Sequence, residues 1–317
     1  MLNLIIREMR PRQWSKNLFV FLPLLFTIRQ YWLPFSETMW IFVALTLGAF
    51  VVFCFASGFV YFVNDLVDVE KDRAHPLKRT RPIASGALPE SVARVALLAI
   101  LAITLVGTVV LDLVSQRFPY PSGAPIFPFP FAFTVVTLTY LVLQVAYSFV
   151  LKNIVIIDVF CIAAGFVLRA VAGAAVIQVP ISPWLYVLTT LLSLFIGFAK
   201  RRNELVILED NAANHRAILK EYSPELLDQM VSVTMACTVI AYSLYTFTAE
   251  NLPKNHAMML TIPFVLYVIF RYLYLIHVKN LGGSPEEMLL KDRPLLISIV
   301  LWGIAVVTIL YAYGGTV

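Results

Sequence analysis

Three aspartates stand at helical spacing directly after a long apolar segment of the chain. In the stretch NDLVDVEKD, Asp65, Asp68 and Asp72 follow one another at i, i+3 and i+7. At about 100° per residue, these positions fall within a sector of roughly 60° on one helix face. Oxygen ligands without histidine or cysteine suit Mg²⁺, and also Mn²⁺. The spacing therefore predicts a catalytic divalent-cation site, with an acidic, solvated helix end as the alternative.

A basic run follows these aspartates at once. The stretch RAHPLKRTRP contains two prolines that stop the helix and turn the chain. Its arginines and lysines are the residues that a polyanionic ligand beside a metal ion requires. We favour Lys78 and Arg81 over Arg79 as ligands, and Asn64 flanks the aspartates as a further binding residue. Anchoring to anionic lipid headgroups would use the same basic residues and is the alternative.

Two ionisable residues lie inside a later apolar segment, where such residues are functional candidates. Asp158 and Arg169 are eleven residues apart, so on one helix they share a face but lie about 16 Å apart along its axis. Each therefore needs its own partner, or a polar cavity lies between them. We expect Asp158 to be catalytic and Arg169 to bind substrate, with a buried structural ion pair as the alternative. Tyr147 and Lys152 flank the same end of this segment and are expected to bind substrate.

A further polar group ends the next apolar segment, in the stretch GFAKRRNEL. Lys200 and Glu204 are at i and i+4 and share a helix face, with Arg201 beside them. We expect Glu204 to complement the cation and the two basic residues to bind phosphate. A surface ion pair between Lys200 and Glu204 is the alternative.

The basic N-terminal stretch RPRQWSKN supplies the last candidates. Its tryptophan and arginines are typical of a membrane-interface anchor, whereas Lys16 and Asn17 are candidates for substrate contact. The sequence contains no nucleophilic triad, P-loop or Rossmann fingerprint, and its four histidines do not cluster at metal-ligand spacing. Nothing in the sequence indicates a nucleic-acid partner.

Membrane-spanning helices must position these residues. The chain has 317 residues, 60% of them hydrophobic and 14% charged, where a soluble protein carries about 25% charge. A span needs about 20 apolar residues, and candidates occur at 15–33, 38–63, 91–114, 130–150, 154–176, 183–202, 225–248, 257–277 and 294–313. We therefore predict an all-α polytopic membrane protein with about nine helices and a single domain over 1–317.

The distribution of basic residues predicts the orientation of these helices. With the N-terminus in the cytoplasm, the cytoplasmic segments and their flanks hold 20 of the 24 lysines and arginines, the exceptions being Arg29, Arg117, Arg169 and Lys254. Such a bias is typical of cytoplasmic loops. It places the long polar loops at 64–90 and 203–224 on the cytoplasmic side, where we expect a polar cavity and the active site.

The aspartate stretch resembles the first motif of the UbiA-type intramembrane prenyltransferase superfamily, N-D-x-x-D-x-x-x-D. The match is complete at Asn64, Asp65, Asp68 and Asp72, and it implies a UbiA-like helical bundle. The second motif of that superfamily usually has two aspartates four residues apart. Here the corresponding stretch KRRNE keeps one acid, Glu204. This departure from the motif argues against ordinary prenyl-diphosphate chemistry.

Longer stretches, among them VYFVNDLVDVEKDRAHPLKRTRPIASGALPE and GFAKRRNEL, are similar to decaprenyl-phosphate phosphoribosyltransferases. The resemblance implies a bacterial-type plasma-membrane enzyme that transfers 5-phosphoribose from phosphoribosyl diphosphate to a polyprenyl phosphate and releases pyrophosphate. A prenyltransferase that moves an isoprenoid from its diphosphate to a small acceptor is the second hypothesis. A transporter or channel is the third, and a homo-oligomer is left open.

Overall fold

Apolar helices make up the architecture, as the composition predicts. The computed structural model describes residues 1–74, 78–118, 129–208, 217–249, 252–279, 288 and 291–313. Within these ranges, eight helical segments are long and apolar enough to cross a membrane. They are α3 (Glu37–Val67), α5 (Glu90–Ser115), α6 (Ala132–Phe149), α7 (Ile157–Val176), α8 (Pro183–Leu208), α10 (Pro224–Thr248), α11 (Ile262–His277, preceded by η6, Ala257–Thr261) and α13 (Arg293–Tyr313).

The first expected span, 15–33, takes a different form from the other eight. Its residues form the 3₁₀ helix η1 (Pro11–Phe21) and then the short helix α2 (Leu22–Phe26). Pro23 lies in the first turn of α2, where its missing N–H leaves no helical bond unmade. Shorter elements complete the described chain: α1 (Leu2–Glu8), α4 (Val69–Ala74), η2 (Lys78–Thr80), η3 (Leu151–Asn153) and η5 (Ala217–Glu221).

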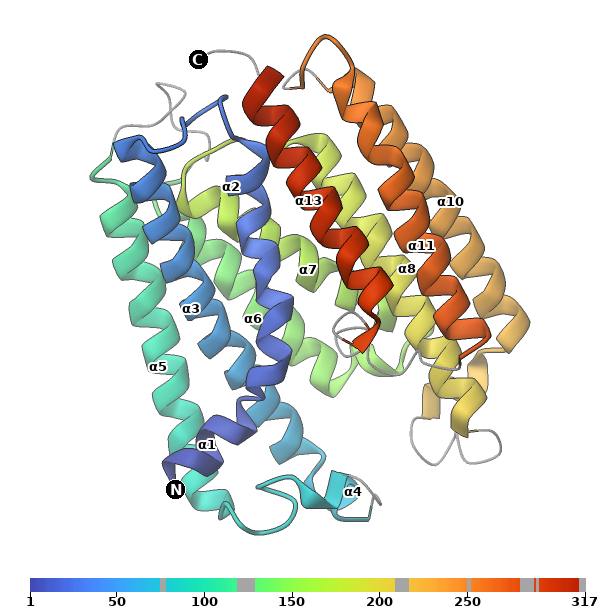
Figure 1. Ribbon diagram of the computed structural model, residues 1–317. Coiled ribbons are helices and arrows are strands. Elements are labelled where there is room, and N and C mark those ends of the chain that lie inside the picture. Colours follow the sequence, from blue (N-terminus) through green and yellow to red (C-terminus); the bar gives the residue numbers. More distant parts are fainter. Residues whose placement is uncertain are drawn as a thin grey trace. The chain divides into compact units, whose positions relative to one another are not determined.

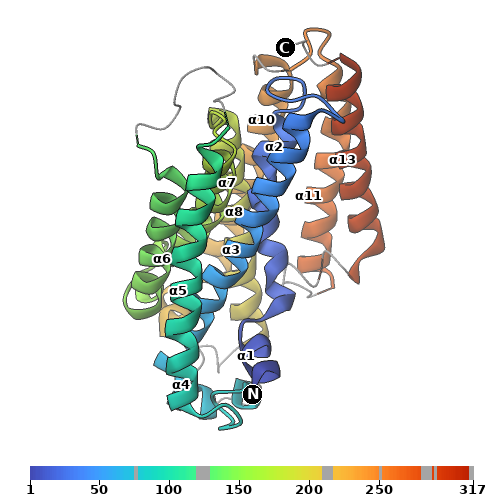
Figure 2. The same cartoon turned by 90° about the vertical axis from the view of Figure 1, so that its left-hand side faces the viewer.

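The helices divide into two compact units, and the prediction of a single domain stays a prediction. Unit 1 contains Met1–Leu22, Ile41–Ile154 and Leu168–Pro180. Within it, α3 and α5 lie side by side (Figure 1, Figure 2). Gly48 of α3 lies against the Leu111 side chain of α5, and Gly107 of α5 against Val52 of α3. Small residues at such crossings let two membrane helices approach closely.

The start of α6 is fixed by a side chain of α5. The buried carboxylate of Asp112 accepts hydrogen bonds from the backbone N–H groups of Phe133 and Thr134, at 3.2 and 2.8 Å. These N–H groups belong to the first helical turn and have no partner inside the helix. Asp112 therefore caps α6 from a neighbouring helix, because the residue at the N-cap, Phe131, offers no side-chain acceptor.

A backbone contact leaves no room for a side chain at one glycine of unit 1. A Cβ atom added to Gly173 of α7 would lie 2.0 Å from the backbone oxygen of Val20 in η1. We expect Gly173→Ala to lower the thermal midpoint of the detergent-purified protein clearly, since backbone atoms would have to move. Gly303→Ala is the control, because nothing lies within 4 Å of a Cβ at Gly303. Equal midpoints for the two variants would contradict this prediction.

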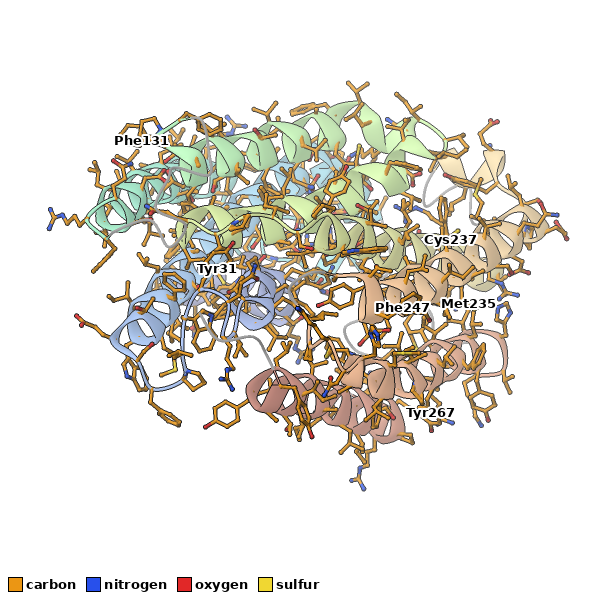
Figure 3. All side chains as sticks on the ribbon, turned by 90° about the horizontal axis from the view of Figure 1, so that it is seen from above. Tyr31, Phe131, Met235, Cys237, Phe247 and Tyr267 are labelled. Atoms are coloured by element: carbon orange, nitrogen blue, oxygen red, sulfur yellow. The ribbon has the colours of Figure 1, made fainter. Side chains whose placement is uncertain are left out.

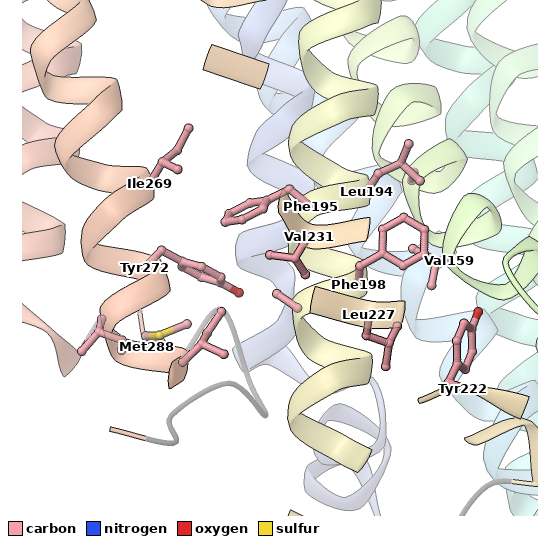
Figure 4. Close-up of a cluster of buried hydrophobic side chains, with 14 of the residues drawn as sticks. Val159, Leu194, Phe195, Phe198, Tyr222, Leu227, Val231, Ile269, Tyr272 and Met288 are labelled. Atoms are coloured by element: carbon pink, nitrogen blue, oxygen red, sulfur yellow. The ribbon is translucent and has the colours of Figure 1, made fainter. Parts of the chain in front are cut away.

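Unit 2 contains Pro23–Trp40, Val155–Val167 and Ile181–Val317. A core cluster joins the first half of α7 to α8, α10, α11 and α13, with Phe198, Leu227 and Tyr272 among its buried members (Figure 4). Helix α10 begins after Ser223, whose Oγ accepts the Leu226 N–H at 3.1 Å, and Pro224 occupies its first turn.

The outward faces of the helices carry apolar side chains, as lipid-facing surfaces do. Phe131, before α6, is 38% exposed and Tyr267, on α11, is 46% exposed, and Figure 3 labels both among the side chains of these helices. The burial of the three cysteines depends on the helix face on which each one lies. Cys54 and Cys161 are buried and Cys237 is exposed on α10.

Candidate active site

The aspartate cluster (Asp65, Asp68 and Asp72) lies where α3 gives way to α4. Asp65 is in the last turn of α3, Asp68 is the residue between the helices, and Asp72 is in α4. The Asp68 N–H donates to the Asn64 oxygen at 2.9 Å, and the Asp72 N–H donates to the Asp68 oxygen at 2.8 Å. The helical hydrogen-bond pattern thus continues through the bend, and Asp65 and Asp72 are both buried.

Arg81 bridges the two buried aspartates. Its Nη1 lies 3.0 Å from Oδ1 of Asp65 and also donates to Oδ2 of Asp72. The turn at η2 brings this side chain back, because the Arg81 N–H donates to the Lys78 oxygen at 2.9 Å. The Nζ of Lys78 lies 3.7 Å from Oδ1 of Asp72, while Arg79 is exposed. The structure therefore brings the two favoured basic residues to the aspartates, although their role as phosphate ligands stays a prediction.

A second arginine reaches the cluster from the N-terminal segment. The Nη2 of Arg10 lies 2.6 Å from Oδ2 of Asp65, and its guanidinium stacks over the Tyr61 ring with 4.6 Å to the ring centroid. Arg10 has φ 53°, in the left-handed region, directly before Pro11. Sequence reasoning treated Arg10 as part of an anchor, since nothing in the pattern links residues 55 positions apart. The only signal in the sequence is that Arg10 directly precedes Pro11, which restricts its backbone and could have indicated a fixed side chain.

The third aspartate has a different cation. Lys152, in η3, donates from Nζ to Oδ2 of Asp68 at 2.8 Å. This ion pair brings Lys152 to the aspartate cluster, and its contact with substrate stays a prediction. Two other candidates of unit 1, Asn64 on α3 and Tyr147 on α6, are partly buried.

Carboxylate oxygens such as those of the aspartate cluster are suitable ligands for a divalent cation. Asp65 and Asp72 already converge on one cationic group, the Arg81 guanidinium. Mg²⁺ is commonly held by one or two carboxylates together with substrate phosphates. Among the described residues, no group of three histidine, cysteine, aspartate or glutamate side chains is arranged to hold a metal ion, and Asp68 binds Lys152. A cation bound by all three aspartates stays a prediction.

A fourth carboxyl group, Glu8 at the end of α1, lies beside the cluster. Glu8 is 1% exposed. Burial, followed by a hydrogen bond with the Asp65 carboxylate and the charge of that carboxylate, raises the pKa of Glu8 to about 8, against the opposing effects of Arg10 and Arg81. Sequence reasoning missed this residue, because a glutamate in a short amphipathic helix is expected to be exposed to solvent.

A separate buried polar network surrounds Arg169 in unit 1. Its Nε donates to Oδ1 of Asn17 at 2.8 Å, and its Nη2 donates to the Tyr140 hydroxyl at 2.8 Å. The Nδ2 of Asn17 donates in turn to Oγ of Ser57 at 3.3 Å. Lys16, the neighbour of Asn17, is partly exposed. The expectation that Arg169 needs its own partner is confirmed, and its role in substrate binding stays a prediction.

The expected partner of Asp158 is found in unit 2. We refer to Asp158, Arg201, Glu204 and Tyr222 as the α8 cluster. Arg201 is buried, and it donates from Nε to Asp158 and from Nη1 to Glu204, both at 2.6 Å. The Tyr222 hydroxyl donates to the other Asp158 oxygen at 2.9 Å and accepts the Ile156 N–H at 2.7 Å.

This arrangement favours the structural alternative for Asp158, because a buried ion pair with full hydrogen bonding needs no further ligand. Burial is the largest cause that raises the pKa of Tyr222 to about 12, so the phenol stays protonated and able to donate. Sequence reasoning missed Tyr222, which precedes α10 in a polar segment. Lys200 is partly buried on α8, next to Arg201.

Relatives of known activity match nearly the whole chain. A decaprenyl-phosphate phosphoribosyltransferase of Mycolicibacterium smegmatis is 31% identical over 308 residues, covering 94% of this chain and 89% of the relative. One of Mycobacterium tuberculosis is 31% identical over 312 residues, covering 98% of this chain and 95% of the relative.

The fold has a solved counterpart. A UbiA homologue from Archaeoglobus fulgidus, bound to GPP and Mg²⁺, superposes with a TM-score of 0.67 at 20% identity, covering 96% of this chain and 99% of that one. At this identity the likeness establishes the helical fold alone. The model of the UbiA prenyltransferase family matches residues 20–290. Together with the helical membrane architecture and the complete N-D-x-x-D-x-x-x-D motif, this match shows that the chain belongs to the UbiA prenyltransferase family.

Proposed function

We propose that this protein transfers a 5-phosphoribosyl group from phosphoribosyl diphosphate to a polyprenyl phosphate and releases pyrophosphate. The observation that carries the proposal is the match, over nearly the full chain, to relatives that bear the name decaprenyl-phosphate phosphoribosyltransferase. The aspartate cluster supports it independently. Arg10, Lys78, Arg81 and Lys152 surround its carboxylates, and this is the combination that a diphosphate with a bound cation requires.

The aspartate cluster binds the diphosphate of the donor in this proposal. Asp65 and Asp72, with Asp68 as the predicted third ligand, would hold a divalent cation, Mg²⁺ or Mn²⁺, and that cation would supply positive charge to the leaving pyrophosphate. The arginines that now bind these aspartates then donate to phosphate oxygens, because charge-assisted bonds to phosphate are as strong as those to carboxylate. The excess of lysine and arginine in the segments on one side of the membrane supports a cytoplasmic location for this site.

The proposed transfer of phosphoribose does not require a proton to be removed from the acceptor. An oxygen of the acceptor phosphate attacks C1 of the ribose, the bond from C1 to the diphosphate oxygen breaks, and pyrophosphate leaves with the electron pair. A phosphate monoester is already largely ionised near neutral pH, so no general base is needed. Catalysis then consists of positioning and of charge stabilisation at an oxocarbenium-like transition state.

The other candidates keep the roles that their chemistry suggests. Lys200 and Arg201 bind phosphate, and Glu204 stabilises positive charge that develops on the ribose. Asp158 acts through Arg201, which it orients by their buried ion pair. Lys16, Asn17, Asn64, Tyr147 and Arg169 contact substrate.

A transfer assay tests the proposal. Detergent-purified protein is given phosphoribosyl diphosphate labelled in the ribose, decaprenyl phosphate and Mg²⁺, and label in the lipid phase is measured together with released pyrophosphate. We expect both, in equal amounts, and neither without Mg²⁺. A parallel reaction contains a prenyl diphosphate and an aromatic acceptor. Turnover in that reaction, with no label in the lipid phase of the first, would overturn the proposal in favour of prenyl transfer.

The same preparation separates an enzyme from a transporter or channel. In proteoliposomes, Asp68→Ala should reduce product formation, since Asp68 belongs to the aspartate cluster. If that substitution changed the flux of substrate across the membrane while no product formed in the unaltered protein, a transport function would be favoured.

A further inference from the structure

Tyr222 links two segments of unit 2 through a single hydroxyl group. It lies between η5 and α10, is 5% exposed, and belongs to the core cluster that also contains Phe198 and Leu227 (Figure 4). The hydroxyl donates to Oδ1 of Asp158 at 2.9 Å and accepts the Ile156 N–H at 2.7 Å. A buried hydroxyl that binds both a carboxylate and a backbone group helps to fix the position of each.

The backbone group that Tyr222 binds belongs to a strained residue. Ile156 has φ 69°, in the left-handed region, where a β-branched residue is a genuine outlier. Ile156 is 37% exposed, so burial of its side chain does not account for this conformation. It directly precedes α7, and its oxygen accepts the Val159 and Phe160 N–H groups, each at 3.0 Å. The Tyr222 hydroxyl therefore helps to hold the strained residue at which α7 begins.

The acid that Tyr222 binds is at the centre of the α8 cluster. Oδ2 of Asp158 accepts from Nε of Arg201 at 2.6 Å, and Nη1 of the same guanidinium donates to Glu204 at 2.6 Å. The side chains of Asp158 and Arg201 are almost fully buried, whereas that of Glu204 is 25% exposed. A ligand would therefore reach the α8 cluster at Glu204, while Tyr222 lies at the other end of this series of hydrogen bonds.

We propose that Tyr222 is a positioning residue for the transfer of phosphoribose. Its hydroxyl fixes the carboxylate of Asp158, which in turn fixes the Arg201 guanidinium. This inference rests on the proposed function, in which Arg201 binds phosphate and Glu204 stabilises charge on the ribose. A guanidinium is planar, so its orientation decides which directed bonds it makes to a phosphate. Without the hydroxyl, Asp158 and Arg201 would stay paired, but the carboxylate would be free to rotate.

The test is Tyr222→Phe in the full-length, detergent-purified protein, assayed with phosphoribosyl diphosphate, decaprenyl phosphate and Mg²⁺. We expect kcat to fall about tenfold, since a small misplacement of a catalytic group is enough for such a loss. The KM for phosphoribosyl diphosphate should change by less than about threefold, because Arg201 keeps its charge and its bond to Asp158.

The matched control is Tyr242→Phe, which removes another buried hydroxyl of unit 2 that has two partners. The Tyr242 hydroxyl accepts the Trp302 indole N–H at 2.7 Å and shares a hydrogen bond of 2.6 Å with the Thr261 hydroxyl. Both variants should lower the thermal midpoint, because each leaves buried polar groups without a partner. Only Tyr222→Phe should lower kcat. Equal losses of kcat in the two variants would mean that Tyr222 supports the fold alone, and the inference would be overturned.

A second variant separates stability from catalysis. Glycine adopts the left-handed conformation without strain, so adding Ile156→Gly should restore part of the thermal midpoint that Tyr222→Phe loses. The kcat of this double variant should stay low, because Asp158 still lacks its second donor. Recovery of kcat together with the midpoint would contradict the inference. Should Tyr222→Phe not fold alone, the double variant is assayed in its place, with Ile156→Gly as the reference.

The assay also separates the role of Tyr222 from the proposed function. A kcat for Tyr222→Phe within a factor of about two of the unaltered protein is the effect of an ordinary substitution and would overturn the inference. If the unaltered protein transfers phosphoribose in that experiment, only the role of Tyr222 fails. If the unaltered protein transfers none, the proposed function fails and the inference fails with it.

Discussion

Asp72→Asn is expected to reduce phosphoribosyl transfer by roughly 10²–10³-fold or more, while the protein still folds. The substitution keeps the shape of the side chain but removes one of the two buried carboxylates that converge on Arg81. An amide is a weak ligand for Mg²⁺, so both cation binding and stabilisation of the leaving pyrophosphate are lost. The measurement is the initial rate of lipid labelling, with the thermal midpoint as the check on folding.

Glu70→Gln is the appropriate control, because Glu70 lies on the same helix as Asp72, α4, but is exposed and pairs with Arg73. Its rate should stay within a factor of about two of the unaltered protein, as expected for a surface substitution. Rates near that of the unaltered protein for both Asp72→Asn and Asp65→Asn would remove the aspartate cluster from the mechanism.

Arg201→Met should produce the largest loss of stability among the site residues. It leaves the fully buried Asp158 with the Tyr222 hydroxyl but without its cation. Removing one partner of a buried ion pair typically costs about 3–5 kcal/mol. The thermal midpoint in detergent measures this loss, and a marked decrease is expected.

The neighbouring residue provides a control on the same helix. Arg202 pairs with Asp228, whose side chain is 40% exposed, and exposed pairs contribute only about 0–1 kcal/mol. Arg202→Met should therefore change the midpoint little. The double variant Arg201→Met with Asp158→Leu should recover part of the lost stability, since no buried charge is then left alone. Equal effects of Arg201→Met and Arg202→Met would show that the α8 cluster is no buried ion pair.

Periodicity and composition were enough to predict eight of the nine expected spans and the helical spacing of the aspartates. Apolar runs of sufficient length must be helical in a membrane, because every backbone group needs an internal partner there. The aspartate spacing also persisted through the bend at Asp68, since the N–H groups of Asp68 and Asp72 keep their helical hydrogen bonds.

The partners of these charges could not be predicted, because each comes from a distant part of the chain. Arg10 lies 55 residues before Asp65 and Lys152 lies 84 residues after Asp68. Helical spacing reports which residues share a face of one helix and says nothing of what that face meets. The irregular first segment escaped prediction for a similar reason, since the contact of Gly173 with the Val20 backbone is visible only once both are folded.

The order in which these cations are synthesised has a consequence for membrane insertion. A ribosome makes Arg10 before the aspartates and Arg81 shortly after them, but Lys152 appears only after α5 and α6. Until then, the only cation given to Asp68 by the described structure is the exposed Lys71, three residues further on, at 3.8 Å. The last step in building the aspartate cluster therefore waits for the loop that follows α6, and a chain arrested before that loop would lack the closer and less exposed cation of Asp68.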